Sequence, residues 1–224
     1  MTRLTIFDLD HTLLDGDSDV LWCEFLMSRG LLDRAEFGAR NAEMERSYRD
    51  GTVGVAEFCS FFIATLALKS RPQWEPWRRA FLAEVIAPRL PAAAHALVRQ
   101  HLDAGDLVVM STATNRFITE LTARHLGIAH LIATECEQAG DTFTGCLTGT
   151  PNMREGKVAR LQAWAAERGL QLADCDTTFY SDSMNDLPLL SVVKQAVVVN
   201  PDARLAAIAA ERGWPVLNLR PQPA

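Results

Sequence analysis

Residues 4–14 read LTIFDLDHTLL, and this stretch decides the fold. Its apolar run has the length of a buried β-strand and ends at Asp8 and Asp10, with Thr12 two residues later. In open α/β sheets, ligands bind at the carboxyl ends of parallel strands. Two neighbouring carboxylates repel each other there unless a metal cation or a shared proton compensates them. The stretch therefore predicts a central strand that carries a chemical site, although aspartate is also common in plain turns.

The composition fits one large α/β domain, or a domain with an insertion, because 48% of the 224 residues are hydrophobic. The 28 acidic residues outnumber the 22 basic ones, which disfavours nucleic acid and anionic membranes as partners. We expect a cytoplasmic protein, because the amino terminus lacks a signal-peptide pattern and no apolar segment approaches the ~20 residues of a membrane helix. The five cysteines form no C-x-x-C pair, which favours reduced thiols. Whether Cys136 and Cys146 bond across a hairpin is left open.

Residues 17–87 show helical periodicity and no strand pattern. Asp17 or Ser18 can cap the first of these helices. A block of this length is too long for a simple crossover between two strands. We therefore predict an inserted all-helical domain at residues 17–87 and a discontinuous core formed by residues 1–16 and 88–224.

From residue 88 onward, helices alternate with short apolar strands, which predicts parallel pairing through right-handed crossovers. The predicted strands cover 107–110, 131–134, 177–180 and 196–199, with a β-hairpin over 135–149. A helix is expected from Asn152, with Asn152 and Glu155 forming a capping box. The predicted fold class is α/β, with a Rossmann-like three-layer parallel sheet core and the inserted helical domain as a cap.

Polar clusters follow the predicted strands or open the predicted helices, and parallel strands would bring them to one edge of the sheet. These clusters are Asp8 with Asp10, Thr112, Lys157, and Asp182 with Asp186. Phosphate esters are anions, so a carboxylate nucleophile needs a divalent cation to offset repulsion, and Mg²⁺ suits a few carboxylates with waters and a phosphate. The predicted metal residues are Asp8, Asp10, Asp182 and Asp186. Of these, Asp186 would hold a metal ligand or a water molecule without touching the ion itself.

Each catalytic role follows from the chemistry of its side chain. Asp8 would attack phosphorus and form an aspartyl-phosphate. Asp10 would protonate the leaving oxygen and later take a proton from the hydrolytic water, provided that the two carboxyls differ in pKa. Thr112 would bind phosphate oxygens together with amides at the following helix start, and Lys157 would neutralise the transition state.

These residues resemble the motifs of the haloacid dehalogenase-like phosphatases. Residues 8–12 (DLDHT) look like motif I, Thr112 like motif II, Lys157 like motif III, and residues 181–186 (SDSMND) like motif IV. The resemblance spans nearly the whole chain, and Ser181 departs from the glycine that usually opens motif IV. It implies that the carboxylates of Asp8 and Asp182 and the backbone carbonyl of Asp10 bind Mg²⁺.

The insertion and the predicted hairpin resemble the C1-capped subfamily IB, which includes phosphoserine phosphatases. This resemblance implies that the acidic residue nine positions after the nucleophile, here Asp17, contacts the amine of the substrate. Residues 15–18 (DGDS) and 40–41 (RN) are similar to a bacterial group with histidinol-phosphate phosphatase activity. Histidinol phosphate is therefore the substrate that we expect first.

Phosphoserine is the alternative substrate, and its carboxylate would need a cation from the cap. Three arginines could supply it: Arg40, Arg46 and Arg49. Asp17 could instead simply cap the first helix of the insertion. Asn115 and Asn185 are further predicted substrate-binding residues.

Two other functions are compatible with parts of the pattern. A phosphotransferase of the same fold would share the chemistry and differ in the acceptor. A phospho-receiver switch would be phosphorylated on aspartate without being an enzyme, but such modules lack a cap and need no acid at Asp10. We expect a small phosphorylated metabolite as the partner, and a monomer or a homodimer.

Overall fold

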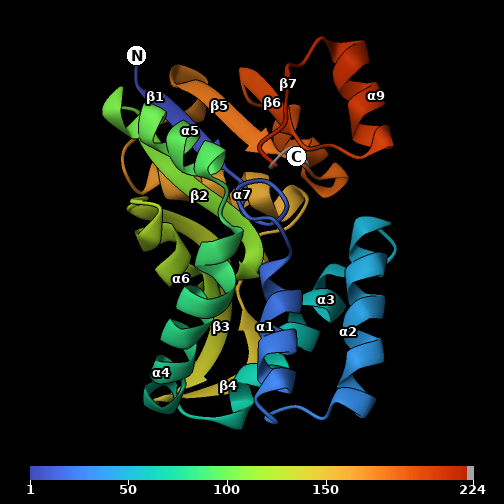
Figure 1. Cartoon of the computed structure of the whole chain (residues 1–224). Helices are drawn as coiled ribbons and strands as arrows, with labels where there is room; N and C mark the ends of the chain where they lie inside the picture. Colours follow the sequence, from blue (N-terminus) through green and yellow to red (C-terminus); the bar gives the residue numbers. More distant parts are fainter. Residues whose placement is uncertain (221–224) are drawn as a thin grey trace.

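The computed structural model of the chain describes residues 1–220, which form a seven-stranded sheet with helices packed around it (Figure 1). In chain order the strands are β1 (Arg3–Phe7), β2 (Leu107–Asn115), β3 (His130–Ala139), β4 (Thr142–Thr148), β5 (Asp176–Ser181), β6 (Gln195–Val199) and β7 (Val216–Leu217). Across the sheet the order is β4-β3-β2-β1-β5-β6-β7, and all neighbours are parallel except the β3–β4 hairpin. The predicted α/β class is confirmed, and β1 lies at the centre of the sheet.

Helices fill the segment between β1 and β2, as the sequence predicted. They are α1 (Ser18–Ser28), α2 (Arg34–Arg49), α3 (Val55–Ile63), a 3-10 turn (Ala64–Leu68), α4 (Arg71–Phe81), a π turn (Leu82–Ile86), a second 3-10 turn (Ala87–Arg89) and α5 (Ala92–Asp103). The helices after β2 are α6 (Arg116–His125), α7 (Glu155–Ala166), α8 (Leu187–Leu190) and α9 (Ala203–Arg212). Residues 18–89 are called the helical insertion below.

The central strand alternates its side chains between the two faces of the sheet, as a buried strand must. Leu4 and Ile6 belong to one apolar cluster with residues of α7, α8 and α9. Phe7 belongs to a second cluster with residues of α5, and its ring meets His101 of that helix edge-on. The sheet therefore has helices on both faces, which makes the three layers that the sequence predicted.

The helical insertion shares one continuous apolar cluster with the core. Its centre is Trp22, whose ring lies 5.4 Å from that of Trp74 and 5.1 Å from that of Phe81. The same cluster includes Phe117 of α6 and Phe143 of the hairpin strand β4, and this strand contacts α3 and the 3-10 turn Ala64–Leu68 of the insertion. The insertion is therefore packed onto the core through buried aromatic side chains as well as being linked by the chain.

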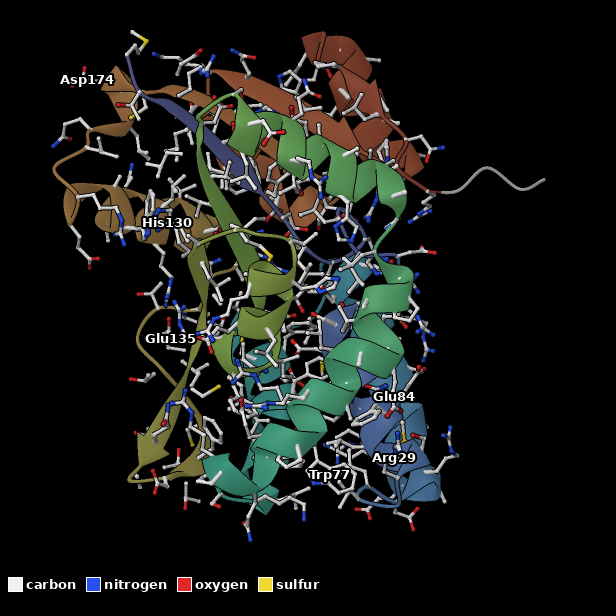
Figure 2. The ribbon with its side chains drawn as sticks, turned by 60° about the vertical axis from the view of Figure 1, so that its left-hand side comes forward. Arg29, Trp77, Glu84, His130, Glu135 and Asp174 are labelled. Carbon is white, nitrogen blue, oxygen red and sulfur yellow. The ribbon has the colours of Figure 1, made fainter. Side chains whose placement is uncertain are left out.

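The two ends of the insertion also meet near the surface. Arg29 at the end of α1 pairs with Glu84 of the π turn, and Figure 2 shows the two side chains facing each other. Trp77 lies nearby, with its ring edge-on to Phe25 at 6.4 Å. An exposed ion pair contributes little stability. The aromatic cluster is therefore what holds the insertion together.

Strand β2 is longer than the sequence predicted, because it continues from the apolar residues 107–110 through the polar residues 111–115. Polar side chains remain in a buried strand when they find hydrogen-bond partners. Asn152 donates to Ser111 Oγ at 3.1 Å, and two threonines further along the strand donate to Asp10. Hydropathy alone ended the strand too early.

The predicted start of α7 at Asn152 is wrong, and the helix begins at Glu155. The buried Asn152 amide does not cap a helix but donates to the carbonyls of Thr112, at 2.9 Å, and Ile132, at 3.0 Å. Its side chain therefore joins β2 to β3, so the predicted capping box with Glu155 does not form. The residue before the helix is Arg154, which has φ of 53° and ψ of −126°.

Two open questions, on cysteine pairing and on membrane-spanning helices, are answered by the described residues. All five cysteines lie within residues 1–220 and are free, and in the β3–β4 hairpin Cys136 lies opposite Leu147 rather than Cys146. Across the same residues, no single helix is long and apolar enough to span a membrane. Residues 71–89 and 92–103 meet those length and composition limits only as a pair, which is bent by 97°.

Candidate active site

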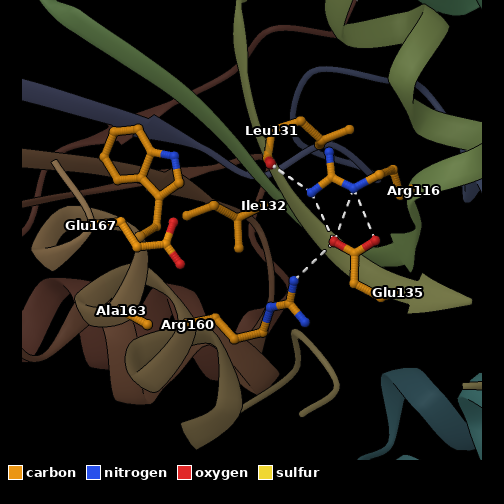
Figure 3. Close-up of a pocket in the computed structure, with 8 residues that line it drawn as sticks. Arg116, Leu131, Ile132, Glu135, Arg160, Ala163 and Glu167 are labelled. Carbon is orange, nitrogen blue, oxygen red and sulfur yellow. Dashed lines mark hydrogen bonds and ion pairs between the residues drawn. The ribbon is translucent and has the colours of Figure 1, made fainter. Parts of the chain in front are cut away.

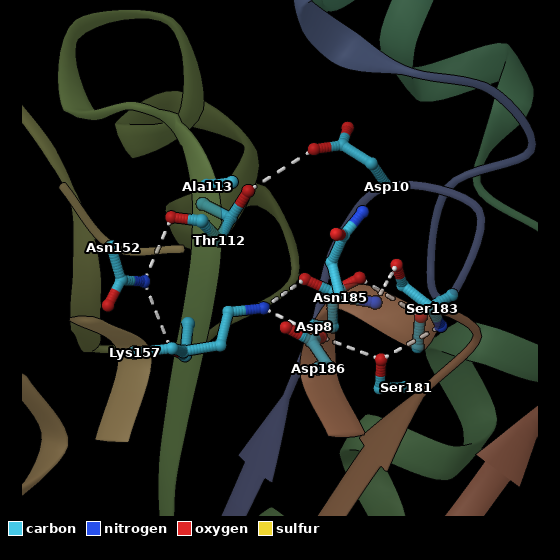
Figure 4. A network of polar contacts seen from close by, with 12 residues as sticks. Asp8, Asp10, Thr112, Ala113, Asn152, Lys157, Ser181, Ser183, Asn185 and Asp186 are labelled. Atoms are coloured by element: carbon cyan, nitrogen blue, oxygen red, sulfur yellow. Dashed lines mark hydrogen bonds and ion pairs between the residues drawn. The ribbon is translucent and has the colours of Figure 1, made fainter. Parts of the chain in front are cut away.

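Asp8 lies at the centre of a polar network at the carboxyl end of β1 (Figure 4). Lys157 Nζ donates to Asp8 Oδ1 at 2.9 Å, and the Thr12 hydroxyl contacts Asp8 Oδ2 at 3.1 Å. Lys157 also donates to Asp186 Oδ2 at 2.7 Å. All four side chains are buried. The structure thus brings together three predicted residues, from the ends of β1 and β5 and from α7, and adds Thr12.

Thr12 connects Asp8 to Asp182. Its Oγ1 lies 2.9 Å from Asp182 Oδ1 and accepts the backbone N–H of Asp182 at 3.0 Å. The two carboxylates therefore flank one hydroxyl oxygen. The sequence analysis gave Thr12 no role of its own, and its place in the Asp-x-Asp-x-Thr pattern was the available signal.

Burial shifts the protonation equilibria of this network. It raises the pKa of Asp8 to about 7, against the opposing effect of the Lys157 ammonium. Burial and then the charge of Asp8 raise the pKa of Asp182. Burial alone would lower the pKa of Lys157, but the carboxylates of Asp186 and Asp8 raise it above its ordinary value. The one ammonium contacts Asp8 and Asp186 but not Asp182, so a further cation would favour the ionised forms of these carboxylates.

Asp10 points from the same loop toward the start of the helical insertion. Its Oδ2 accepts from the hydroxyls of Thr112, at 3.2 Å, and Thr114, at 3.0 Å, and its Oδ1 accepts the backbone N–H of Ser18 at 2.7 Å. Alternate residues of a strand share a face, so both threonines face Asp10 while Ser111 faces the other side. Thr112 therefore lies beside the predicted general acid, and Thr114 is a neighbour that the sequence analysis missed.

Two of the four predicted metal residues present carboxylates that fit Mg²⁺. Asp8 and Asp182 flank the Thr12 hydroxyl, and Mg²⁺ is commonly held by one or two protein carboxylates with waters and substrate phosphate. Within residues 1–220, no group of three or more His, Cys, Asp or Glu side chains is arranged to hold a metal ion. The donor set therefore suits an ion with few protein ligands, and not a cage of four aspartates.

The other two predicted metal residues have carboxylates that are already engaged. Asp10 is held by hydroxyls and a backbone amide, which leaves its carbonyl as the donor that the family resemblance implies. Asp186 Oδ2 accepts from Lys157 and from Ser181, both at 2.7 Å. The Asp186 carboxylate thus contacts Lys157 and does not stand free to bind a metal ion. The hydroxyl of Ser181, at the position where the family motif usually has glycine, holds the Asp186 carboxylate through this hydrogen bond.

Two further buried carboxylates stand at the start of α1. Asp17 caps the helix through Oδ1, which accepts the Val20 N–H at 2.9 Å, and Asp19 Oδ1 accepts from Asn115 at 3.3 Å. Burial, followed by repulsion from Asp10 and Asp19, raises the pKa of Asp17. Burial and repulsion from Asp10 raise the pKa of Asp19 to about 8. In the part of the chain that the structure describes, no ion pair reaches either carboxylate.

Asp19 is a site candidate that the sequence analysis missed, although it is the third acid in the run DGDSD at residues 15–19. An acid in the first turn of a helix favours the helix start without being buried. In the structure it is buried instead, between α1 and the start of α6. Contacts between distant segments, which the sequence pattern does not contain, determine this burial.

The amides of both predicted substrate-binding asparagines have protein partners. Asn115 caps α6 by accepting the Ile118 N–H at 3.1 Å, and its Nδ2 contacts Asp19. Asn185 donates to the backbone carbonyl of Tyr48 at 2.9 Å and accepts from Arg154 Nε at 3.1 Å. Both residues border the site, and each connects the core to another element.

Cavities lie on two sides of this region. One of about 250 Å³ borders Asp182 and is lined also by His11, Arg49 and Arg220. Another of about 290 Å³ is separate from the predicted site residues (Figure 3). It is lined by Arg116, Arg160 and Glu135, and the Glu135 carboxylate accepts from both arginines, so their charges are compensated.

Comparison with known proteins agrees with this geometry. The family of haloacid dehalogenase-like hydrolases matches residues 5–191. A histidinol-phosphatase of Neisseria meningitidis is 43% identical over 98% of this chain and 100% of its own length. The phosphoserine phosphatase SerB1 of Mycobacterium tuberculosis is 33% identical over 98% of this chain and 72% of its own.

Solved structures share the fold. A Bordetella pertussis protein of unknown function, 43% identical, has a TM-score of 0.93 and covers 98% of this chain and 100% of its own. A substrate-bound phosphoserine phosphatase has a TM-score of 0.70 at 15% identity, which shows likeness of fold alone, and covers 98% of this chain and 94% of its own.

The chain belongs to the haloacid dehalogenase-like hydrolase family. Within that family it is a phosphatase, which confirms the class of enzyme that the four motifs indicated and excludes the non-enzymatic receiver.

Proposed function

We propose that this phosphatase is a Mg²⁺-dependent phosphomonoesterase that hydrolyses a small amine-bearing phosphate ester, histidinol phosphate first, through an aspartyl-phosphate on Asp8. The observation that carries the proposal is the convergence of Asp8, Lys157 and Asp182 on one buried point at the carboxyl end of β1. The five free cysteines support a reducing, cytoplasmic location.

The chain's own residues supply a nucleophile and a proton carrier. A carboxylate oxygen of Asp8 forms a bond to phosphorus while the bond from phosphorus to the ester oxygen breaks. Asp10 gives its proton to that leaving oxygen, and it then accepts a proton from the water that attacks the aspartyl-phosphate. This second step releases phosphate and restores the Asp8 carboxylate. Thr112 and Thr114 keep Asp10 oriented through both steps.

Charge compensation is the second requirement. Lys157 lies 2.9 Å from Asp8 and offsets the charge that builds on the phosphoryl group. Asp186 holds this ammonium in place at 2.7 Å. Mg²⁺ bound between Asp8 and Asp182 would lower repulsion between the nucleophile and the phosphate oxygens.

The substrate class follows from the uncompensated acids at the start of α1. Asp17 and Asp19 are buried, close to Asp10, and an ammonium group on the substrate would compensate them. A phosphoserine carboxylate would need a cation beside them. The three candidate arginines of the cap are all exposed: Arg40, Arg46 and Arg49. This exposure and the Neisseria relative favour histidinol phosphate over phosphoserine.

The experiment is a comparison of kcat/KM for histidinol phosphate, phosphoserine and glycerol phosphate, with Mg²⁺ and with a chelator. We expect the highest value for histidinol phosphate and loss of all activity on chelation. In Asp17→Asn, kcat/KM should fall about 10- to 100-fold for the amine substrate and much less for glycerol phosphate, because one charged contact is lost.

If Asp17→Asn lowers kcat/KM equally for histidinol phosphate and glycerol phosphate, Asp17 serves only as a helix cap. Turnover of sugar phosphates alone would refute the amine assignment. Product analysis separates hydrolysis from phosphoryl transfer, because a phosphotransferase would yield a new ester in place of free phosphate.

A further inference from the structure

The turn that follows α2, residues 48–53, is held from the core by two side chains. Arg154 Nη2 donates to the backbone carbonyls of Gly51, at 3.0 Å, and Val53, at 3.4 Å. Asn185 Nδ2 donates to the carbonyl of Tyr48 at 2.9 Å. Arg154 Nε also donates to Asn185 Oδ1 at 3.1 Å, so the two side chains act as one clasp.

The backbone of Arg154 is strained. Its φ of 53° and ψ of −126° place it in a region that favours glycine and that L side chains rarely adopt. Such a conformation persists only where the surrounding structure holds it, and it often occurs at functional positions. The three contacts of the Arg154 side chain are therefore the interactions that hold this strained backbone in place.

The clasp grips a helix that is only partly anchored by apolar packing. Asn41 is the only fully buried residue of α2, and Phe37, Met44 and Tyr48 pack against the shared cluster while partly exposed. The polar contacts at residues 48–53 therefore add to this packing in linking the carboxyl end of α2 to the core. Arg204 of α9 adds one more, to the carbonyl of Arg49 at 2.8 Å.

The same clasp is tied directly to the catalytic network. Arg154 stands three residues before Lys157, and Asn185 stands next to Asp186. On the other side of the clasp, Tyr48 stacks on Phe58 with ring centroids 4.5 Å apart.

We propose that Arg154 is a positioning residue that seats the turn at residues 48–53 on the core, and thereby holds the carboxyl end of α2 against Asn185, beside Asp186 and Lys157 of the catalytic network. This inference rests on the proposed function for its kinetic consequence but not for the clasp itself.

The decisive variant is Arg154→Gly, because glycine adopts the observed backbone conformation without strain while the clasp is lost. We expect its thermal midpoint to equal or exceed that of the wild type. We also expect KM to rise about 10- to 100-fold, as for the loss of charged hydrogen bonds, with a smaller change in kcat. Arg154→Lys should recover only part of this, because lysine lacks the planar fork.

Amide hydrogen exchange of residues 44–54, measured without substrate, tests the clasp independently of turnover. It should be faster in Arg154→Gly than in the wild type, and unchanged in the control Arg168→Ala, which alters an arginine beyond the far end of α7. Unchanged exchange, or a lower thermal midpoint with an unchanged KM, would overturn the inference. A wild-type chain that hydrolyses no phosphate ester would refute the proposed function, and the exchange result would still report on the clasp.

Discussion

At the scale of single residues, this site is a set of buried carboxylates and the few groups that compensate them. Lys157 serves Asp8 and Asp186, and Thr12 links Asp8 to Asp182. Burial and repulsion from Asp10 disfavour the ionised form of Asp19 and raise its pKa, and only neutral hydrogen-bond donors oppose this effect. The acids at the start of α1 and those at the end of β1 therefore differ in what compensates them, and we propose an organic cation for the first group and a metal ion for the second.

Asp19→Asn should stabilise the protein in the absence of substrate. Because the pKa of Asp19 is raised to about 8 by folding, its contribution is most favourable below its unfolded pKa and is lost as pH rises toward 8. The free energy of unfolding of the variant, relative to wild type, should therefore increase between about pH 4 and pH 8, by on the order of a few kcal/mol. Urea unfolding across this range measures it, with the exposed Asp15→Asn as control. A pH-independent difference would contradict the assignment.

Thr12→Val should weaken Mg²⁺ dependence while keeping the shape of the side chain. Loss of a hydroxyl that orients two ligand carboxylates is expected to lower apparent metal affinity about 10- to 100-fold. Activity titrated against Mg²⁺ concentration measures the change, and Thr144→Val in the exposed hairpin is the control. An unaltered Mg²⁺ titration would mean that Thr12 serves the fold alone.

At the scale of elements, the sequence predicted what depends on hydropathy period and missed what depends on tertiary contact. Strand β1 and the convergence of Asp8, Lys157 and Asp182 could be predicted, because an apolar strand in a parallel sheet places its end at a known edge. The polar half of β2 could not, because its hydroxyls are satisfied by residues far along the chain. For the same reason Arg154 had no signal in the sequence.

At the start of α7, contacts with distant strands override the local capping pattern. Asn152 and Glu155 have capping-box spacing, yet the Asn152 amide bonds to β2 and β3. Asn152→Ala should destabilise the protein by about 1–3 kcal/mol or more, because buried carbonyls lose their donors. Chemical denaturation measures this, and Gln162→Ala on the exposed face of α7 is the control. Equal stability of the two variants would show that the bridge is dispensable.

At the scale of the whole molecule, the apolar cluster that joins the insertion to the core predicts one cooperative unit. Three of the five tryptophans, Trp22, Trp74 and Trp77, lie in the insertion. In the double variant Trp164→Phe and Trp214→Phe, fluorescence therefore reports on the insertion alone. Its thermal transition should coincide with the far-ultraviolet circular dichroism transition of the whole chain. An earlier fluorescence transition would show that the insertion unfolds by itself.

The central claim is that Asp8 attacks phosphorus, and trapping of the covalent intermediate tests it most directly. Enzyme mixed with substrate and Mg²⁺ is quenched in acid, reduced with borohydride and analysed by peptide mass spectrometry. The account predicts homoserine at position 8 in the wild type, the product of reducing an aspartyl-phosphate. It also predicts a larger yield in Asp10→Asn, in which hydrolysis is slowed, and none in Asp8→Asn. Hydrolysis without any homoserine at position 8 would contradict this account, and so would an Asp8→Asn variant that retains turnover.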